Sequence, residues 1–245
     1  MLSVLRSVQR RFNPDPEIVR KLFHIGMGLF ALSFPVLIPN RVAAVLLCGG
    51  TIGLLITLRR VPKLRKRYGA VLGSVTRHSY GELYFAPGVT AVFCWAKDEM
   101  TLYAIPILVL TFADSAAALI GEHFGKHRFC LIEGHKSIEG CLAFLSVATV
   151  CIYALLLLLA NSDSESAMLL AIALGFLLTL VEALSWRGLD NLLIPVAGCL
   201  FLKDLLTRTN EELIAVIVIT ILLFASLLLG QEQKYAENNS RTRRA

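Results

Sequence analysis

Long apolar runs separated by short polar segments dominate the chain. A helix that spans a bilayer needs about 20 mostly apolar residues, with a range of about 17–25. Eight runs meet or approach that length, at residues 22–38, 42–58, 82–96, 101–121, 138–160, 166–184, 191–202 and 213–230. The pattern predicts an all-α integral membrane protein, a polytopic bundle of about eight transmembrane helices that forms a single membrane-embedded domain over residues 1–245.

Two of these runs are shorter than the others and contain a proline. Pro87 lies within 82–96 and Pro195 lies within 191–202. A short run with a proline can cross the bilayer, or it can be a re-entrant segment that is buried in protein. The sequence leaves both interpretations open for these two runs.

Composition and charge agree with the membrane class and indicate an orientation. The chain is 56% hydrophobic, whereas soluble domains are about 45–50% apolar. Lys and Arg near span ends mark the cytoplasmic side. If the N-terminus and all eight crossings follow that rule, both termini are cytoplasmic, and only four of the 24 basic residues face outward: Arg41, Lys97, Lys203 and Arg208.

The net charge of +6 is explained by this topology and by anionic lipid headgroups. No basic and aromatic interleaving typical of nucleic-acid binding is present, so we expect membrane lipids and not nucleic acid as partners. Residues 1–21 are predicted to be a basic cytoplasmic segment, and residues 231–245 a polar, disordered tail. The membrane would be the plasma membrane in a bacterium, and the endoplasmic reticulum or plastid envelope in a eukaryote.

Asp114 is the first candidate for chemistry, because it lies inside the run 101–121. An ionisable residue at membrane depth is costly and is a functional-site candidate. Small residues accompany it at steps of four, which places them on one helix face where another backbone can approach closely. These residues are Ala113, Ala117, Gly121 and Gly125.

The polar segment that follows has the residues expected for phosphate binding. It contains Lys126 and Lys136, and Ser137 is a favoured N-cap for the next helix. The free N–H groups of a helix N-terminus bind anions, and lysines add charge-assisted contacts. Glu139 falls in the first turn, where it is either favoured by the helix dipole or part of the site.

Acidic residues from several predicted helices lie on the same inner side. They are Glu82, Asp114, Glu182 and Asp190. Mg²⁺ usually binds through one or two carboxylates together with substrate phosphates and water. Phosphoryl transfer requires mainly such positioning and charge neutralisation. The glycine spacing before Lys126 does not match a P-loop, and a helix-start role for Glu82 is equally open.

The first span begins with three polar residues at helical spacing, Arg20, Lys21 and His24. Basic residues at a span end often extend toward the interface and set topology. His24 lies one turn deeper, as an interhelical histidine or as a substrate contact.

These motifs resemble the CTP-dependent lipid-alcohol kinases, namely phytol kinase, dolichol or polyprenol kinase and the CTP-using diacylglycerol kinase, a family related to phosphatidate cytidylyltransferase. The resemblance lies in four motifs. The first is Arg-Lys-x-x-His at the start of the first span, and the second is Asp-x-x-Ala-x-x-x-Gly-x-x-x-Gly-Lys from Asp114 to Lys126. The third is Lys-Ser-x-Glu-Gly from Lys136 to Gly140, and the fourth is an acid followed by Asp-Asn near the end (Glu182, Asp190 and Asn191). Ala113 departs from the pattern, since many relatives have glycine before the aspartate.

The resemblance implies CTP as phosphoryl donor, a divalent cation such as Mg²⁺, and a membrane-dissolved lipid alcohol that is phosphorylated at the cytoplasmic face. Together with the residues it gives expected roles. Catalysis is assigned to Asp114, Lys136 and Glu139, with Asp114 and Asp190 holding the metal. Nucleotide binding is assigned to Gly121, Gly125, Lys126, Ser137, Gly140, Asp190 and Asn191. Substrate or supporting contacts are assigned to Arg20, Lys21, His24, Glu82 and Glu182.

Two other classes of function compete with the kinase. A cytidylyltransferase that forms a CDP-activated lipid would use the same nucleotide but react at the α-phosphate. A transporter would use buried acids to couple to protons or sodium, and these acids should then lie near mid-membrane.

Overall fold

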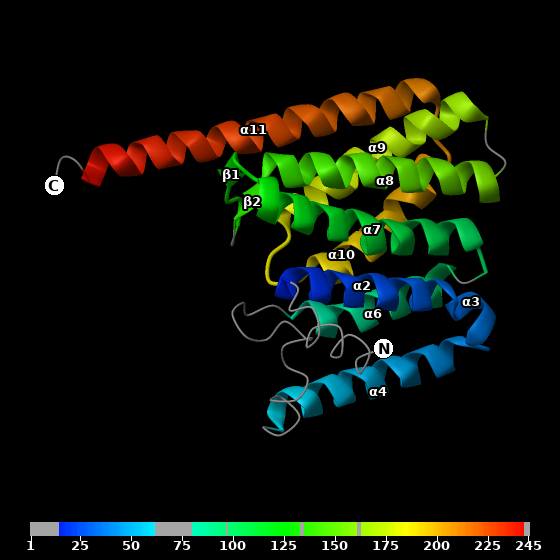
Figure 1. Cartoon of the computed structure of the whole chain (residues 1–245). Helices are drawn as coiled ribbons and strands as arrows, with labels where there is room; N and C mark the ends of the chain where they lie inside the picture. The colour runs from blue at the N-terminus through cyan, green and yellow to red at the C-terminus, as the bar shows by residue number, and fades with distance from the viewer. Residues whose placement is uncertain (1–14, 62–79, 97, 133–134, 161–162, 243–245) are drawn as a thin grey trace.

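The computed structural model describes residues 15–61, 80–96, 98–132, 135–160 and 163–242 as a bundle of helices (Figure 1). The helices are α2 (Pro16–Leu32), α3 (Phe34–Leu37), α4 (Arg41–Arg60), α6 (Gly81–Ala96), α7 (Met100–Phe124), α8 (Ile138–Leu159), α9 (Ser164–Leu184), α10 (Asp190–Leu205) and α11 (Asn210–Thr242). Two short strands, β1 (Arg128–Phe129) and β2 (Lys136–Ser137), lie between α7 and α8.

Every apolar run predicted as a span is helical in the structure, and α2 with α3 covers the first run. Five helices are long and apolar enough to cross a membrane: α4, α7, α8, α9 and α11. This agrees with the predicted all-α membrane protein. Helices α2, α6 and α10 have 17, 16 and 16 residues, so the eight crossings and their orientation stay a prediction.

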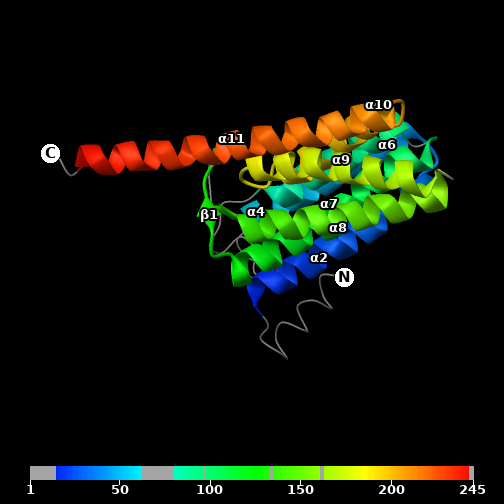
Figure 2. The same cartoon turned by 90° about the horizontal axis from the view of Figure 1, so that it is seen from above.

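Helix α7 forms the centre of the bundle, and its buried side chains include Tyr103, Ile107 and Leu110. It packs against α2, α8 and α10. Helix α9 covers α8 and α10, while α4 packs on α6 and α11 packs on α9 at the periphery (Figures 1 and 2). The two peripheral helices expose large apolar side chains such as Leu46 and Leu222. Such surfaces suit contact with lipid chains and not with water.

One end of the bundle collects the polar residues and is called the polar end below. It is formed by the starts of α2, α6, α8 and α10 and by the ends of α7 and α9 (Figure 1). The start of α2 lies at this end, and the last part of α11 extends past it on the same side (Figure 1). The alternating direction of successive helices therefore brings residues from distant parts of the sequence together.

The predicted small-residue face of α7 is confirmed as a close contact with α8. A β-carbon built on Gly140 would lie 3.0 Å from the carbonyl oxygen of Ala117 and 3.3 Å from the Cα atom of Gly121. A β-carbon built on Gly121 would lie 3.1 Å from Ser137 Oγ. The two backbones therefore touch where the helices meet at the polar end, as small residues allow.

We expect Gly121→Leu to reduce folded yield and thermal stability, because a large side chain on this face must push α8 away from α7. Overpacking of this kind costs about 1–3 kcal/mol or more. Gly50→Leu is the matched control, since no neighbouring element of the described structure comes within 4 Å of a β-carbon built on Gly50 in α4. Melting curves of both variants in detergent test the difference, and equal stabilities would contradict the packing role.

Two features differ from the sequence prediction. The segment 126–136, predicted as a plain polar loop, contains the β1–β2 pair, in which Arg128 is opposite Ser137 and Phe129 is opposite Lys136. The polar tail, predicted to be disordered, continues α11 as helix through Thr242. Its Gln, Glu, Lys and Ala residues are good helix formers, which explains this result. Most of the basic loop between α4 and α6 lies outside the described residues.

Candidate functional site

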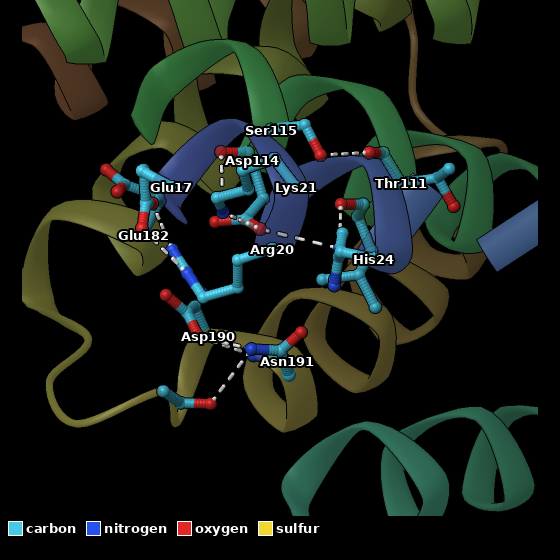
Figure 3. A network of polar contacts seen from close by, with 12 residues as sticks. Glu17, Arg20, Lys21, His24, Thr111, Asp114, Ser115, Glu182, Asp190 and Asn191 are labelled. Carbon is cyan, nitrogen blue, oxygen red and sulfur yellow. Dashed lines mark hydrogen bonds and ion pairs between the residues drawn. The ribbon is translucent and has the colours of Figure 1, made fainter. Parts of the chain in front are cut away.

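Asp114 forms a buried ion pair with Lys21 of α2 at the polar end (Figure 3). Lys21 Nζ donates to Asp114 Oδ2 at 2.7 Å and to the Asp114 carbonyl oxygen at 3.2 Å. The two residues are only 3% and 5% exposed. Lys21 therefore does not extend to the interface as a topology residue, and it holds both the side chain and the backbone of Asp114.

His24 joins this pair one turn further along α2. Its Nε2 lies 3.0 Å from the carbonyl oxygen of Leu110 and 3.4 Å from Asp114 Oδ2. A carbonyl oxygen can only accept, so Nε2 carries the hydrogen. The ring also packs edge to face on Phe85 of α6, with centroids 5.5 Å apart. His24 thus links α2, α6 and α7 beside the buried carboxylate.

A second ion pair joins the half-buried Lys136 of β2 to the buried Glu182 of α9. Burial disfavours the Lys136 ammonium, but the charge of Glu182 and its hydrogen bond outweigh burial and raise the pKa of Lys136 above its ordinary value of 10.5. The charges of Asp190 and Asp114 act in the same direction. Lys136 therefore stays charged throughout the neutral and mildly alkaline range, as a phosphate-binding group must.

The N-terminus of α8 is more closed than the sequence predicts. Ser137 is the N-cap as expected, and its Oγ accepts from Gly140 N at 3.1 Å. The Ile138 N–H, however, donates to the His127 carbonyl oxygen at 3.0 Å. Glu139 Oε1 accepts from the backbone N–H of His127 and lies 2.7 Å from its Nδ1. A phosphate could use this helix end only after some of these contacts open.

Asp190 and Asn191 begin α10 directly after a tight turn. Arg187 and Gly188 in that turn have φ angles of 51° and 88°, in the left-handed region that reverses the chain. Asp190 Oδ1 accepts from Asn191 N and from Asn191 Nδ2, both at 2.9 Å. Asn191 Oδ1 is buried and has no partner in the described part of the chain.

The other predicted site residues lie around this cluster with different exposure. Arg20 forms an ion pair with Glu17 one turn earlier, with Nε 2.8 Å from Glu17 Oε2. Lys126 is exposed at the end of α7, and Glu82 is half-buried in the first turn of α6. A β-carbon built on Gly125 would lie 2.7 Å from Ser137 Oγ, so this glycine makes room for the α8 N-cap.

The carboxylates of the site fit the predicted Mg²⁺ only in part. No three His, Cys, Asp or Glu side chains converge on one point within the described ranges. The Lys21 ammonium occupies the place at Asp114 Oδ2 that a cation would take. Asp190 is half-buried, and its Oδ1 bonds within the described residues to the backbone N–H and amide nitrogen of Asn191 and not to an ammonium group, so it fits a cation better. An ion there would need oxygens from substrate phosphates and water, which is usual for Mg²⁺.

The partners of the predicted residues were missed at the sequence level. The sequence singled out Lys21, Asp114, Lys136 and Glu182 but not the two pairs that they form. Glu17 was not singled out, although its spacing of three residues from Arg20 on one helix is a signal for an ion pair.

Comparison with known proteins adds a family to this geometry. Residues 7–185 match the model of the cytidylyltransferase family. A phytol kinase of Synechocystis sp. is 30% identical over 189 residues, which cover 75% of this chain and 77% of that protein. A CTP-dependent diacylglycerol kinase 1 of Eremothecium gossypii is 26% identical over 223 residues, covering 80% of this chain and 69% of that protein.

A CTP-dependent diacylglycerol kinase 1 of Schizosaccharomyces pombe is 28% identical over 209 residues, covering 75% of this chain and 91% of that protein. No solved structure matches. These relatives confirm the resemblance that the motifs indicated, and the family match extends from before α2 to the end of α9. The chain therefore belongs to the cytidylyltransferase family.

Proposed function

We propose that this protein is a kinase that transfers the γ-phosphoryl group of CTP to the hydroxyl group of a membrane-dissolved lipid alcohol. The observation that carries the proposal is the cluster of buried charges at the polar end. The ion pairs Lys21–Asp114 and Lys136–Glu182 come from four elements, and the charge of Asp114 also acts on Lys136. The names of the relatives, phytol kinase and CTP-dependent diacylglycerol kinase, support the same reaction.

The proposed roles follow from charge and exposure. Lys126 and Lys136 lie on the segment between α7 and α8, from which a nucleotide in water can approach. We assign the triphosphate to these ammonium groups, because lysines bind phosphate as point charges. Lys21 holds Asp114 as an anion next to His24, and we assign these three residues to the orientation of the reacting groups.

Mg²⁺ would bind with CTP at Asp190 and neutralise charge on the phosphates during transfer. Asp114 as a second ligand stays a prediction that requires Lys21 to move away. We expect the lipid to reach the site from the bilayer, with its chain along the apolar helices and its hydroxyl at the polar end. Phytol and diacylglycerol are the alcohols to be tested first.

Labelled CTP tests the reaction directly. We expect purified protein with an alcohol substrate and Mg²⁺ to move label from the γ-phosphate of CTP into the lipid, and not label from the cytosine ring. Phytol, farnesol, a polyprenol and diacylglycerol should be compared in parallel. No transfer of γ-label to any of them would refute the kinase.

The second candidate is a cytidylyltransferase, because the matching family carries that description. It would transfer the cytidylyl group to a lipid phosphate, so label from the cytosine ring would appear in the lipid. The same experiment with phosphatidate as acceptor therefore separates the two reactions. A transporter is less well supported, since Glu82, Glu182 and Asp190 lie in the first or last turn of their helices, at the polar end of the bundle.

We further propose that the polar end faces the cytoplasm, as the distribution of basic residues predicts. In sealed cells, a membrane-impermeant thiol reagent is expected to leave Lys126→Cys unmodified and to modify Lys203→Cys. Both residues are exposed, Lys126 just after the end of α7 and Lys203 in the last turn of α10, at the opposite end of the bundle. Modification of position 126 from outside would reverse the orientation.

A further inference from the structure

Asn191 has a side-chain oxygen for which the described residues offer no hydrogen-bond partner. The residue is only 6% exposed. Buried polar atoms nearly always have a partner, so one without a donor requires an explanation. A ligand that donates a hydrogen bond to Asn191 Oδ1 would explain why the oxygen has no partner among the described residues.

The position of this oxygen is fixed by the other half of the amide. Asn191 Nδ2 donates to Asp190 Oδ1 at 2.9 Å and to the carbonyl oxygen of Gly188 at 3.2 Å. Both partners are acceptors. A flipped amide would place its oxygen against two oxygens, so the hydrogen-bond network itself assigns the orientation.

The packing of α6 against α10 keeps Asn191 in place. A β-carbon built on Gly88 of α6 would lie 2.5 Å from the Asn191 carbonyl oxygen, so α6 and α10 touch at this residue. In Figure 3 the amide nitrogen is directed to Asp190, and the oxygen lies on the opposite side, toward His24. His24 packs on Phe85, so this side of the site combines one free acceptor with aromatic surface.

We propose that Asn191 Oδ1 accepts the hydrogen bond of the lipid alcohol's hydroxyl group and thereby selects an alcohol over a phosphorylated lipid. The inference rests on the proposed function and moves Asn191 from the nucleotide to the lipid. A neutral acceptor between α2, α6 and α10 suits an O–H donor on an apolar chain. A lipid phosphate, which is largely deprotonated at neutral pH, would place its own oxygens against Oδ1.

The nucleotide is less suited to this position. The exposed Lys126 and the charged Lys136 lie on the segment between α7 and α8. Asn191, in contrast, lies where α10 contacts α6. Phosphates are expected at the lysines. The lipid hydroxyl would then lie between Asn191 and the γ-phosphate, with Asn191 as a specificity-determining residue.

Binding of a matched pair of ligands tests the proposal without CTP. Phytol and its methyl ether differ in one O–H donor. We expect the wild-type protein in lipid nanodiscs to bind phytol about tenfold more tightly than the ether, as one hydrogen bond to a buried acceptor implies. Affinities are measured from the ligand-dependent rise in melting temperature. Equal affinities, or no binding of phytol, would overturn the proposal.

Two variants test whether Asn191 Oδ1 is responsible for the preference for phytol over its methyl ether. Asn191→Leu removes the acceptor and is expected to abolish the preference, whereas Asn191→Gln retains both an acceptor oxygen and an amide donor and is expected to keep it. A preference that survives in Asn191→Leu would overturn the proposal, as would an effect of that variant on CTP or Mg²⁺ binding alone. If Asn191→Leu does not fold, the wild-type comparison decides. An intact preference without phosphoryl transfer would refute the kinase but not the role of Asn191.

Discussion

In an Asp114→Asn variant, we expect phosphoryl transfer to be lost and the melting temperature to fall. The sequence alone suggests a near-isosteric change that leaves the fold intact. The structure shows that Asp114 is the buried partner of Lys21, so the variant leaves an unpaired ammonium group in the bundle. Removal of one partner from a buried ion pair costs about 3–5 kcal/mol. Melting curves in detergent and transfer of γ-label from CTP measure the two effects.

The double variant Lys21→Met/Asp114→Asn separates stability from chemistry. It removes the unpaired charge, so we expect most of the lost stability to return while activity stays absent. Asp204→Asn is a control for ion pairs in general, because the Asp204–Arg208 pair at the other end of α10 is exposed. Exposed pairs contribute little, and we expect no clear change there. An unchanged melting temperature in Asp114→Asn would show that the buried pair does not stabilise the fold.

The second large effect is expected for Lys136→Met, which should lose at least about tenfold in kcat/KM for CTP. A charge-assisted contact to phosphate is worth about 1.5–3 kcal/mol, which corresponds to one to two decades in rate. If Lys136 binds the phosphate more strongly as negative charge develops during transfer, its removal lowers kcat/KM. Steady-state kinetics with CTP at saturating lipid measure this loss.

Glu182 complicates this result, because it is left as an unpaired buried carboxylate in Lys136→Met. The double variant Lys136→Met/Glu182→Gln should recover stability but not activity. Glu182→Gln alone keeps the ammonium group and should retain more activity than either variant that lacks Lys136. Lys203→Met, with an exposed side chain near the opposite end of the bundle, should be neutral. Equal losses at Lys136 and Lys203 would mean that these lysines act only through bulk charge.

Most of the architecture could be predicted because it depends on local composition. Helix positions follow from apolar runs of bilayer length, and the structure places a helix on each of them. The Ser137 N-cap and the close approach of α7 to α8 also depend on residues near in sequence or on one helix face. The motif residues themselves were identified by the same local patterns.

Three features of the site were decided by the tertiary structure. Lys21 and Asp114 are 93 residues apart, and Lys136 and Glu182 are 46 residues apart. Pairing at such separations depends on how each helix is rotated about its axis and on the depth of its polar residues, and hydropathy specifies neither. The closure of the α8 N-terminus by Glu139 and His127 depends in addition on the fold of the segment around β1 and β2.

The clearest example is Asn191. The sequence by itself placed an Asp-Asn pair at the start of a short apolar run and, with the family resemblance, grouped both residues with the nucleotide. Only the packing of α10 against α6 and the turn at Gly188 decided which half of the Asn191 amide is satisfied. Among the described residues its oxygen has no partner, because the nearby backbone and Asp190 supply acceptors for the nitrogen and no donor for the oxygen.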